Sequence, residues 1–314
     1  MKIASFRYPL LLLLALICAR PLAAQTSDAD RARLLSSPTT VPVPGNLPES
    51  GVEQGYAAAS PNDSDLGEQA ILKRVEKYEP FTLETGVPIY YTSNVALVDR
   101  GRVSDVIIAP VIGLTYAPKI TKTLYGEFTL RQQFFYYQDF SSFDFASFDA
   151  IAGLVYYVPK LNNLTLRANL GYNRLTATDD FDDFFSNYAL GFSAEVPMRI
   201  GRAQQISFGA DANISLYATP DPPQRSDFGA YVGYSVNLSR NFSLNAAGRL
   251  VVRPYYNGGR TDVSEILALS ANYRIREWLV ISALTTFVAN QSNRNAFDYE
   301  VFNIGGGVTV SWKF

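Results

Sequence analysis

The stretch FSLNAAGRLVVRP, residues 242–254, decides the fold because its side chains alternate between apolar and polar. Phe242, Leu244 and Leu250 fall on one face, whereas Arg249 and Arg253 fall on the other. Residues two apart in a β-strand share a face, so the stretch predicts a strand with one apolar and one wet side.

The same alternation recurs from residue 81 to the C-terminus, most clearly at residues 164–175, 206–217 and 228–239. A soluble β-sandwich also alternates, so period two alone does not decide between the two classes. The segments are about 12 to 14 residues long, near the length of a tilted membrane strand with its ends. Aromatic residues gather at the segment ends, as interface belts require. These features favour a membrane barrel.

We therefore predict an all-β protein, a transmembrane antiparallel up-and-down β-barrel over residues 81–314 with twelve strands. Ten or fourteen strands stay open because the second and eleventh segments alternate poorly. The expected strands are residues 81–93, 105–118, 123–137, 147–158, 164–176, 187–198, 205–217, 228–239, 242–256, 263–275, 278–289 and 299–314. Short turns are expected near Lys119, Lys160, Gly201, Arg240 and Arg276, and longer loops near Arg100, Ser141, Asp180, Pro222, Gly259 and Ser292.

Residues 1–24 have the pattern of a secretory signal peptide. Lys2 and Arg7 precede a short apolar run, about half the length that a membrane-spanning helix needs, and Ala23-Ala24 offers a cleavage site. Cys18 is interpreted as an apolar filler of this leader. The leader also holds Arg20, so its removal changes the count from 27 to 24 basic residues against 29 acidic ones, a net charge of −5. This balance argues against nucleic-acid binding.

Two segments precede the barrel. Residues 25–63 are rich in Pro, Ser, Thr and Gly, which predicts a flexible, disordered periplasmic segment. Residues 64–78 predict a short helix, with Ser64 as its cap and Leu66, Ile71 and Val75 on one stripe. Two interpretations of this helix stay open: a linker, or a helix that enters or closes the barrel mouth.

The last strand carries a family resemblance. Val308, Val310, Trp312 and Phe314 share one face, and Phe314 ends the chain. A terminal Phe on an alternating strand resembles the C-terminal assembly signal of bacterial outer-membrane barrel proteins, a porin-like class in which no specific family is identified. The resemblance implies location in the cell outer membrane and the barrel-assembly machinery as a partner during biogenesis.

The connections carry opposite charges at the two ends. Basic residues dominate the short turns and acidic residues the longer loops, which an even strand count places on opposite sides of the membrane. Two interpretations of this difference stay open. In the first, polar connections carry charge for no further reason than their exposure to water. In the second, the basic turns meet phospholipid head groups, and the acidic loops meet lipopolysaccharide through divalent cations. Residues 179–183 are the best place for such a cation, although they lack the spacing of a calcium loop. We assign no resident metal or cofactor.

The polar faces of the strands should line the lumen, because charge in the hydrocarbon is costly. The expected lumen-lining residues are Glu84, Glu127, Arg131, Asp149, Arg167, Glu195, Asp211, Arg249, Arg253, Arg274 and Lys313. Lumenal glycines leave interior room, and no loop is long enough to fold in as a large constriction. The chain contains no His, which excludes Ser-His and Cys-His catalysis and argues against an enzyme.

Three functions remain from the sequence. The first is a narrow passive channel for small polar solutes or ions, because a barrel of this size lies between filled eight-stranded barrels and wide porins. The second is a non-conducting structural or surface-interaction barrel that uses its Phe- and Asp-rich loops. The third is an autotransporter-like translocator, for which the segment before the barrel is short. The oligomeric state is not predicted.

Overall fold

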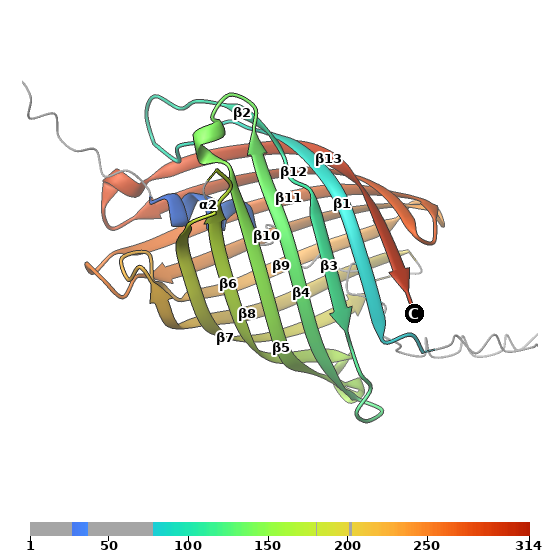
Figure 1. Cartoon of the computed structure of the whole chain (residues 1–314). Coiled ribbons are helices and arrows are strands. Elements are labelled where there is room, and N and C mark those ends of the chain that lie inside the picture. The colour runs from blue at the N-terminus through green and yellow to red at the C-terminus, as the bar shows by residue number, and fades with distance from the viewer. Residues whose placement is uncertain (1–26, 37–77, 180, 201–202) are drawn as a thin grey trace, which may run out of the picture.

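Antiparallel pairing runs through successive strands and returns to the first, which closes the sheet into a barrel of twelve wall strands (Figure 1). This computed structural model describes residues 27–36, 78–179, 181–200 and 203–314. The strand segments are β1 (Phe81–Thr92), β2 (Asp105–Ile108), β3 (Val111–Tyr116), β4 (Leu124–Tyr137), β5 (Phe145–Val158), β6 (Leu164–Ala177), β7 (Asp183–Arg199), β8 (Gln204–Thr219), β9 (Asp227–Asn237), β10 (Phe242–Pro254), β11 (Thr261–Arg276), β12 (Leu279–Ser292) and β13 (Tyr299–Lys313). The predicted barrel and its strand count are confirmed.

The second wall strand is interrupted, which explains its poor alternation in the sequence. β2 and β3 both lie between β1 and β4, so together they form one wall strand. The break falls at Pro110, which has no N–H to donate to the ladder. Its carbonyl still accepts a hydrogen bond of 2.9 Å from the backbone N–H of Phe134. Pairing on either side of the proline therefore keeps the wall continuous.

The barrel closes where β1 meets β13. Eleven residue pairs join the two strands, from Thr82 with Lys313 to Thr92 with Asn303. Beyond the ladder, Phe81 and Phe314 exchange two backbone hydrogen bonds of 3.0 Å, and their rings stack with centroids 5.4 Å apart. Closure leaves no strand edge, so the backbone polar groups are satisfied inside a membrane. The C-terminal residue therefore completes the wall itself.

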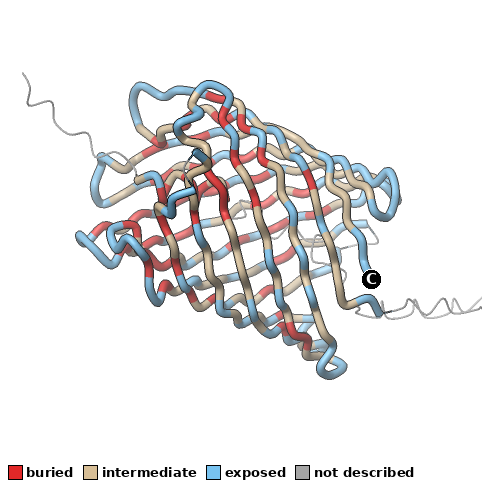
Figure 2. The backbone as a smooth tube through the Cα atoms, in the orientation of Figure 1, coloured by how far each residue is buried: buried red, intermediate tan, exposed pale blue. Residues whose placement is uncertain are grey.

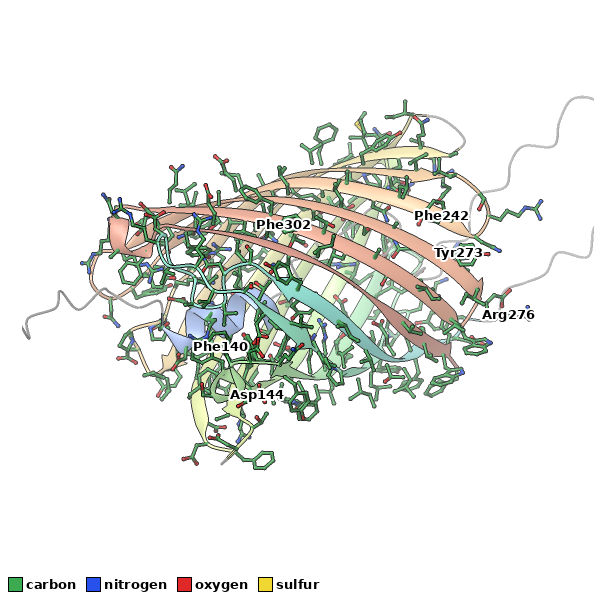
Figure 3. All side chains as sticks on the ribbon, turned by 90° about the horizontal axis from the view of Figure 1, so that it is seen from above. Phe140, Asp144, Phe242, Tyr273, Arg276 and Phe302 are labelled. Atoms are coloured by element: carbon green, nitrogen blue, oxygen red, sulfur yellow. The ribbon has the colours of Figure 1, made fainter. Side chains whose placement is uncertain are left out.

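The two ends of the barrel differ. The five short turns follow β3, β5, β7, β9 and β11, and we call this side the short-turn end. The other connections form the longer-loop end; they include the short 3₁₀ turns Ser141–Phe143 and Asn295–Phe297, whereas Pro159–Leu161 lies in a short turn. Figure 3 shows Phe140 and Asp144 at the longer-loop end, and Phe242, Tyr273 and Arg276 at the opposite end.

The outer face is an apolar band and the inner face is mixed. More buried and less buried residues alternate along the strands (Figure 2). Exposed apolar side chains of the outer face include, in wall order, Ile89, Leu114, Leu130, Leu154, Leu170, Phe192, Phe208, Val232, Leu250, Leu267, Ile281 and Ile304. Surface of this kind is stable against lipid chains and not against water. Within the part of the chain that the structure describes, no helix is long and apolar enough to cross a membrane.

A short helix lies inside the barrel at the longer-loop end. This helix, α2 (Asp28–Ser36), begins after Ser27, whose hydroxyl accepts a hydrogen bond of 3.1 Å from the backbone N–H of Asp30. The prediction of a flexible periplasmic segment over residues 25–63 is therefore wrong for residues 28–36. The helix predicted at 64–78 lies outside the described residues except for Tyr78, which is not helical.

Candidate functional site

The middle of the lumen is lined by charged and polar side chains from several strands. Arg249 of β10 donates a hydrogen bond of 2.6 Å to Asp211 of β8. These strands are not neighbours, and Gly229 of β9 lies between them. A Cβ at Gly229 would stand 2.8 Å from the Asp211 carboxylate and 2.9 Å from the Arg249 guanidinium. The glycine therefore lets the ion pair lie flat against the wall.

A second polar group lies on β4, β5 and β6. Asp149 accepts hydrogen bonds from the Asn173 amide at 2.7 Å and from the Ser147 hydroxyl at 3.3 Å. On the neighbouring β4, Arg131 donates to the Gln133 side chain at 2.8 Å. These bonds hold an acid and a base on one part of the lumen wall.

A third group is centred on Tyr231 of β9. Its ring lies directly over Gly209, where an added Cβ would be 2.3 Å from the ring carbon Cζ. Glu195 and Arg167 lie close enough to Tyr231 to act on its phenol electrostatically. Lumenal glycines thus accommodate neighbouring side chains at these positions, in place of the open room that the sequence suggested.

The predicted lumen residues all lie on the inward face by strand parity, opposite the exposed apolar set. The structure joins Arg249 to Asp211 and brings Arg253 within 3.8 Å of Asp227. Toward the short-turn end it places four of them that make no ion pair with another described residue. These four are Glu84, Glu127, Arg274 and Lys313.

The longer-loop end of the lumen is apolar on its inner wall, which the alternation did not predict. One side chain set, which we call the apolar collar, consists of Ile107, Phe135, Phe145, Leu175 and Phe185. All five are inward-facing and at most 3% exposed, and the rings of Phe135 and Phe145 stack at 4.3 Å. Ala29 and Ala32 of α2 pack against this collar. Leu34 packs on the opposite wall against Val251, Ile266, Val288, Tyr299 and Val301.

Asp30 anchors α2 to the longer loops. Its carboxylate accepts hydrogen bonds from Arg225 at 2.7 Å, from the Tyr255 hydroxyl at 2.9 Å and from Arg260 at 3.2 Å. Both arginines hold a second carboxylate, because Arg225 lies 3.0 Å from Asp227 and Arg260 lies 2.5 Å from Asp262. The Asp30 and Arg225 side chains are only 5% and 7% exposed, so the cluster is shielded from water.

The buried arginines Arg225 and Arg33 keep their charges at neutral pH. Burial opposes the charge of Arg225, but Asp227, Tyr255 and Asp30 outweigh burial and raise the pKa of this guanidinium well above its usual range. Arg33, one turn along α2, donates a hydrogen bond of 3.1 Å to the Pro223 carbonyl. Burial, with repulsion from Arg225, lowers the pKa of Arg33 to about 10, which still leaves it protonated at pH 7. Attachment of α2 is therefore electrostatic at physiological pH.

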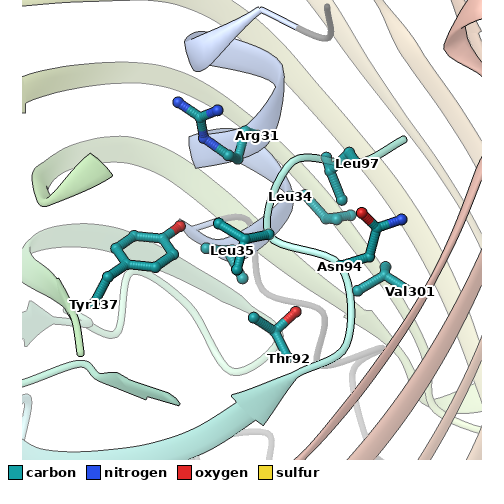
Figure 4. Close-up of a pocket in the computed structure, with 9 residues that line it drawn as sticks. Arg31, Leu34, Leu35, Thr92, Asn94, Leu97, Tyr137 and Val301 are labelled. Carbon is teal, nitrogen blue, oxygen red and sulfur yellow. The ribbon is translucent and has the colours of Figure 1, made fainter. Parts of the chain in front are cut away.

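The β1–β2 connection folds inward over α2 (Figure 4). Val95 and Leu97 of this loop are 3% and 2% exposed, and they join Leu34, Tyr137 and Val301 around a small cavity beside the helix. Asn94 fixes the loop by donating hydrogen bonds to the carbonyls of Val98 and Glu300. The sequence predicts that no loop is long enough to form a large constriction, and this short loop instead covers an apolar surface that the helix supplies.

Sequence reasoning missed the anchor residues of this cluster. Arg225 and Arg260 read as ordinary loop charges, and Asp30 lay in a segment predicted to be flexible. A helix signal was present, since Ser27 is followed by Asp28 and Asp30 in what becomes the first turn. Nothing in the sequence pattern indicated that this helix would enter the barrel.

The acidic cluster at 179–183 does not form a ligand set in the described residues. Asp183 instead pairs with Arg174 at 2.5 Å, and Asp180 lies outside the described residues. Across the positions that the structure describes, no three carboxylate or other metal-binding side chains converge.

A closed barrel with an apolar outer band and a charged lumen is an outer-membrane β-barrel. No family model and no curated protein matches the sequence. Among solved structures, an outer membrane channel from Pseudomonas putida F1 matches with a TM-score of 0.52 and 13% identity, covering 76% of this chain and 98% of that one. The NanC porin matches with a TM-score of 0.43 and 9% identity, covering 72% of this chain and 98% of that one. An anion-selective porin from Comamonas acidovorans matches with a TM-score of 0.37 and 8% identity, covering 74% of this chain and 99% of that one. These likenesses concern the fold alone.

Proposed function

We propose that this barrel is a narrow passive channel for small polar solutes or ions. The observation that carries the proposal is the lumen wall, where charged side chains of both signs face the interior instead of an apolar core. A filled barrel of soluble type would bury apolar side chains there, whereas a wet channel needs groups that water and ions can solvate. The sequence contains no His, which excludes Ser-His and Cys-His catalysis.

The proposed channel is narrowed at the longer-loop end. α2, the apolar collar and the β1–β2 loop meet there, and buried side chains fill the space between helix and wall. Below the helix, the Arg249–Asp211 pair and the Asp149 group lie along the wall. The helix therefore acts as the constriction of the pathway, and conductance depends on whether it stays in place.

Single-channel recording in a planar bilayer tests this proposal. The comparison is between the full chain and a variant that lacks residues 27–36. The full chain should show a small conductance, and the deletion should raise it several-fold because the helix no longer fills the mouth. Heat-dependent mobility on gels must show that both forms are folded. Two folded barrels that both stay silent would refute the channel.

The other two functions predicted from the sequence have weaker support. A surface-interaction barrel would need a partner held by the longer loops while the lumen stays closed. A translocator would need the segment before the barrel to reach the cell surface. Both stay predictions, together with lipopolysaccharide and the barrel-assembly machinery as partners. We also propose that both ends of the chain lie in the periplasm, so that the longer loops face outward.

A further inference from the structure

Asp30 occupies a site that could hold a carboxylate from another molecule. Two arginines and a tyrosine hydroxyl converge on one oxygen pair, at 2.7, 3.2 and 2.9 Å, and all these groups are buried. Guanidinium groups recognise carboxylates by charge-assisted hydrogen bonds of this kind. The acceptor comes from α2, while every donor comes from the barrel loops.

The charges of the barrel leave this site positive when α2 is absent. The mouth then holds Arg225, Arg253 and Arg260 against Asp227 and Asp262, all close to one another. Three cations against two anions leave an excess of one positive charge. A single carboxylate offsets it, and in the structure the Asp30 side chain holds this place, although α2 also brings the Arg33 guanidinium near Arg225.

The surface beside this site is apolar. Ala29, which precedes Asp30, and Ala32, one turn along, pack on the apolar collar. Without the helix, Phe135, Phe145 and Phe185 would face water at the entrance of an otherwise polar lumen. Exposed apolar surface of this kind marks a binding site for apolar matter.

We propose that the longer-loop mouth binds small organic carboxylates with an apolar body, and that α2 occupies the site as an internal substitute for them. The carboxylate takes the place of Asp30 between Arg225 and Arg260, and the apolar body lies on the collar in place of the two alanines. This inference rests on the proposed channel function, and it names the class of solute that enters. Solute and helix compete, so the apparent affinity falls with the fraction of molecules whose mouth is occupied by α2.

Equilibrium dialysis of labelled benzoate against the full-length protein in non-ionic detergent tests the proposal. Asp30→Asn weakens the hold on α2 and should bind benzoate at least about tenfold more tightly than the unaltered chain. Asp28→Asn is the matched control, because Asp28 lies on the same helix but outside the cluster and is 72% exposed. This control should bind benzoate as the unaltered chain does.

Two further probes separate the parts of the site. Acetate has the charge without the apolar body, and benzyl alcohol has the body without the charge, so both should bind at least about tenfold more weakly than benzoate. Replacing Arg225 and Arg260 together by Gln in the Asp30→Asn background should abolish benzoate binding. Should that variant fail to fold, Tyr255→Phe removes one hydroxyl donor and should lower the affinity several-fold.

Equal benzoate binding by Asp30→Asn and the unaltered chain would overturn the proposal, and so would benzyl alcohol binding as tightly as benzoate. Bilayer recording on the same preparations keeps the two proposals apart. Conductance without benzoate binding would refute the proposed class of solute but not the proposed channel. Benzoate binding by barrels that do not conduct would refute the proposed channel but not the proposed binding site.

Discussion

Replacing Asp30 by Ala should release α2 from the barrel mouth. The substitution removes the acceptor of three hydrogen bonds and leaves Arg225 and Arg260 each with one carboxylate, Asp227 or Asp262. Breaking a buried ion pair costs about 3–5 kcal/mol when the remaining charge has no partner. Because both arginines keep a partner, we expect the lower end, about 3 kcal/mol. At about 1.4 kcal/mol per factor of ten, the undocked fraction rises by about two orders of magnitude.

Thiol labelling measures this fraction directly. The predicted mature chain contains no Cys, so Ala32→Cys introduces a single thiol at a position that is 2% exposed against the collar. A bulky water-soluble maleimide should label it slowly, and about 100-fold faster when Asp30→Ala is added. Asp28→Ala is the control, because an exposed ion pair with Arg31 is worth at most about 1 kcal/mol. Equal labelling rates with and without Asp30 would refute the anchoring role of the cluster.

Two further predictions concern the seam and the lumen. Gly305→Ala should reduce the fraction of heat-modifiable folded barrel, because its Cβ would lie 2.2 Å from the Ile89 carbonyl oxygen, and backbone shifts of this kind cost about 1–3 kcal/mol. Gly171→Ala, whose Cβ has its nearest neighbour at 3.9 Å, should fold normally; equal loss in both would contradict a steric cause. Asp211→Asn leaves Arg249 without its carboxylate, so reversal potentials in the form lacking residues 27–36 should shift toward anion selectivity. Arg249→Gln should shift them the opposite way, and shifts in the same direction would exclude a lumenal role for this pair.

The wall of the barrel could be predicted from the sequence because lipid imposes one rule on every strand. Outward residues such as Leu250 must be apolar, whereas Arg249 and its inward neighbours are free of that constraint. Alternation therefore gives the strands, the facing of each side chain and the closing strand at Phe314. Strand ends were predicted less well: β7 begins at Asp183 instead of residue 187, and its pairing with β6 shifts register between Leu175 and Thr176, which interrupts the alternation at this end.

The longer-loop mouth could not be predicted in the same way. Inward positions there are apolar where α2 covers them, and the contacts join residues far apart in the chain, 230 positions in the case of Asp30 and Arg260. The helix itself is short and polar, so its stability comes from docking and not from its own sequence. A segment rich in Ser, Pro and Thr around it favoured a flexible interpretation.

The apolar collar has a consequence for how the lumen works. In a lumen open to water, polar side chains on the inner wall would be solvated and would cost no free energy of desolvation. Solvent contact alone therefore does not explain why Phe135, Phe145 and Phe185 lie on this wall. The inward residues of one strand change from polar to apolar as the strand approaches α2. On β5, for example, the inward residue Asp149 is polar, whereas Phe145, nearer the helix, is apolar. The change from a polar to an apolar inner wall along single strands therefore coincides with the part of the lumen that α2 covers.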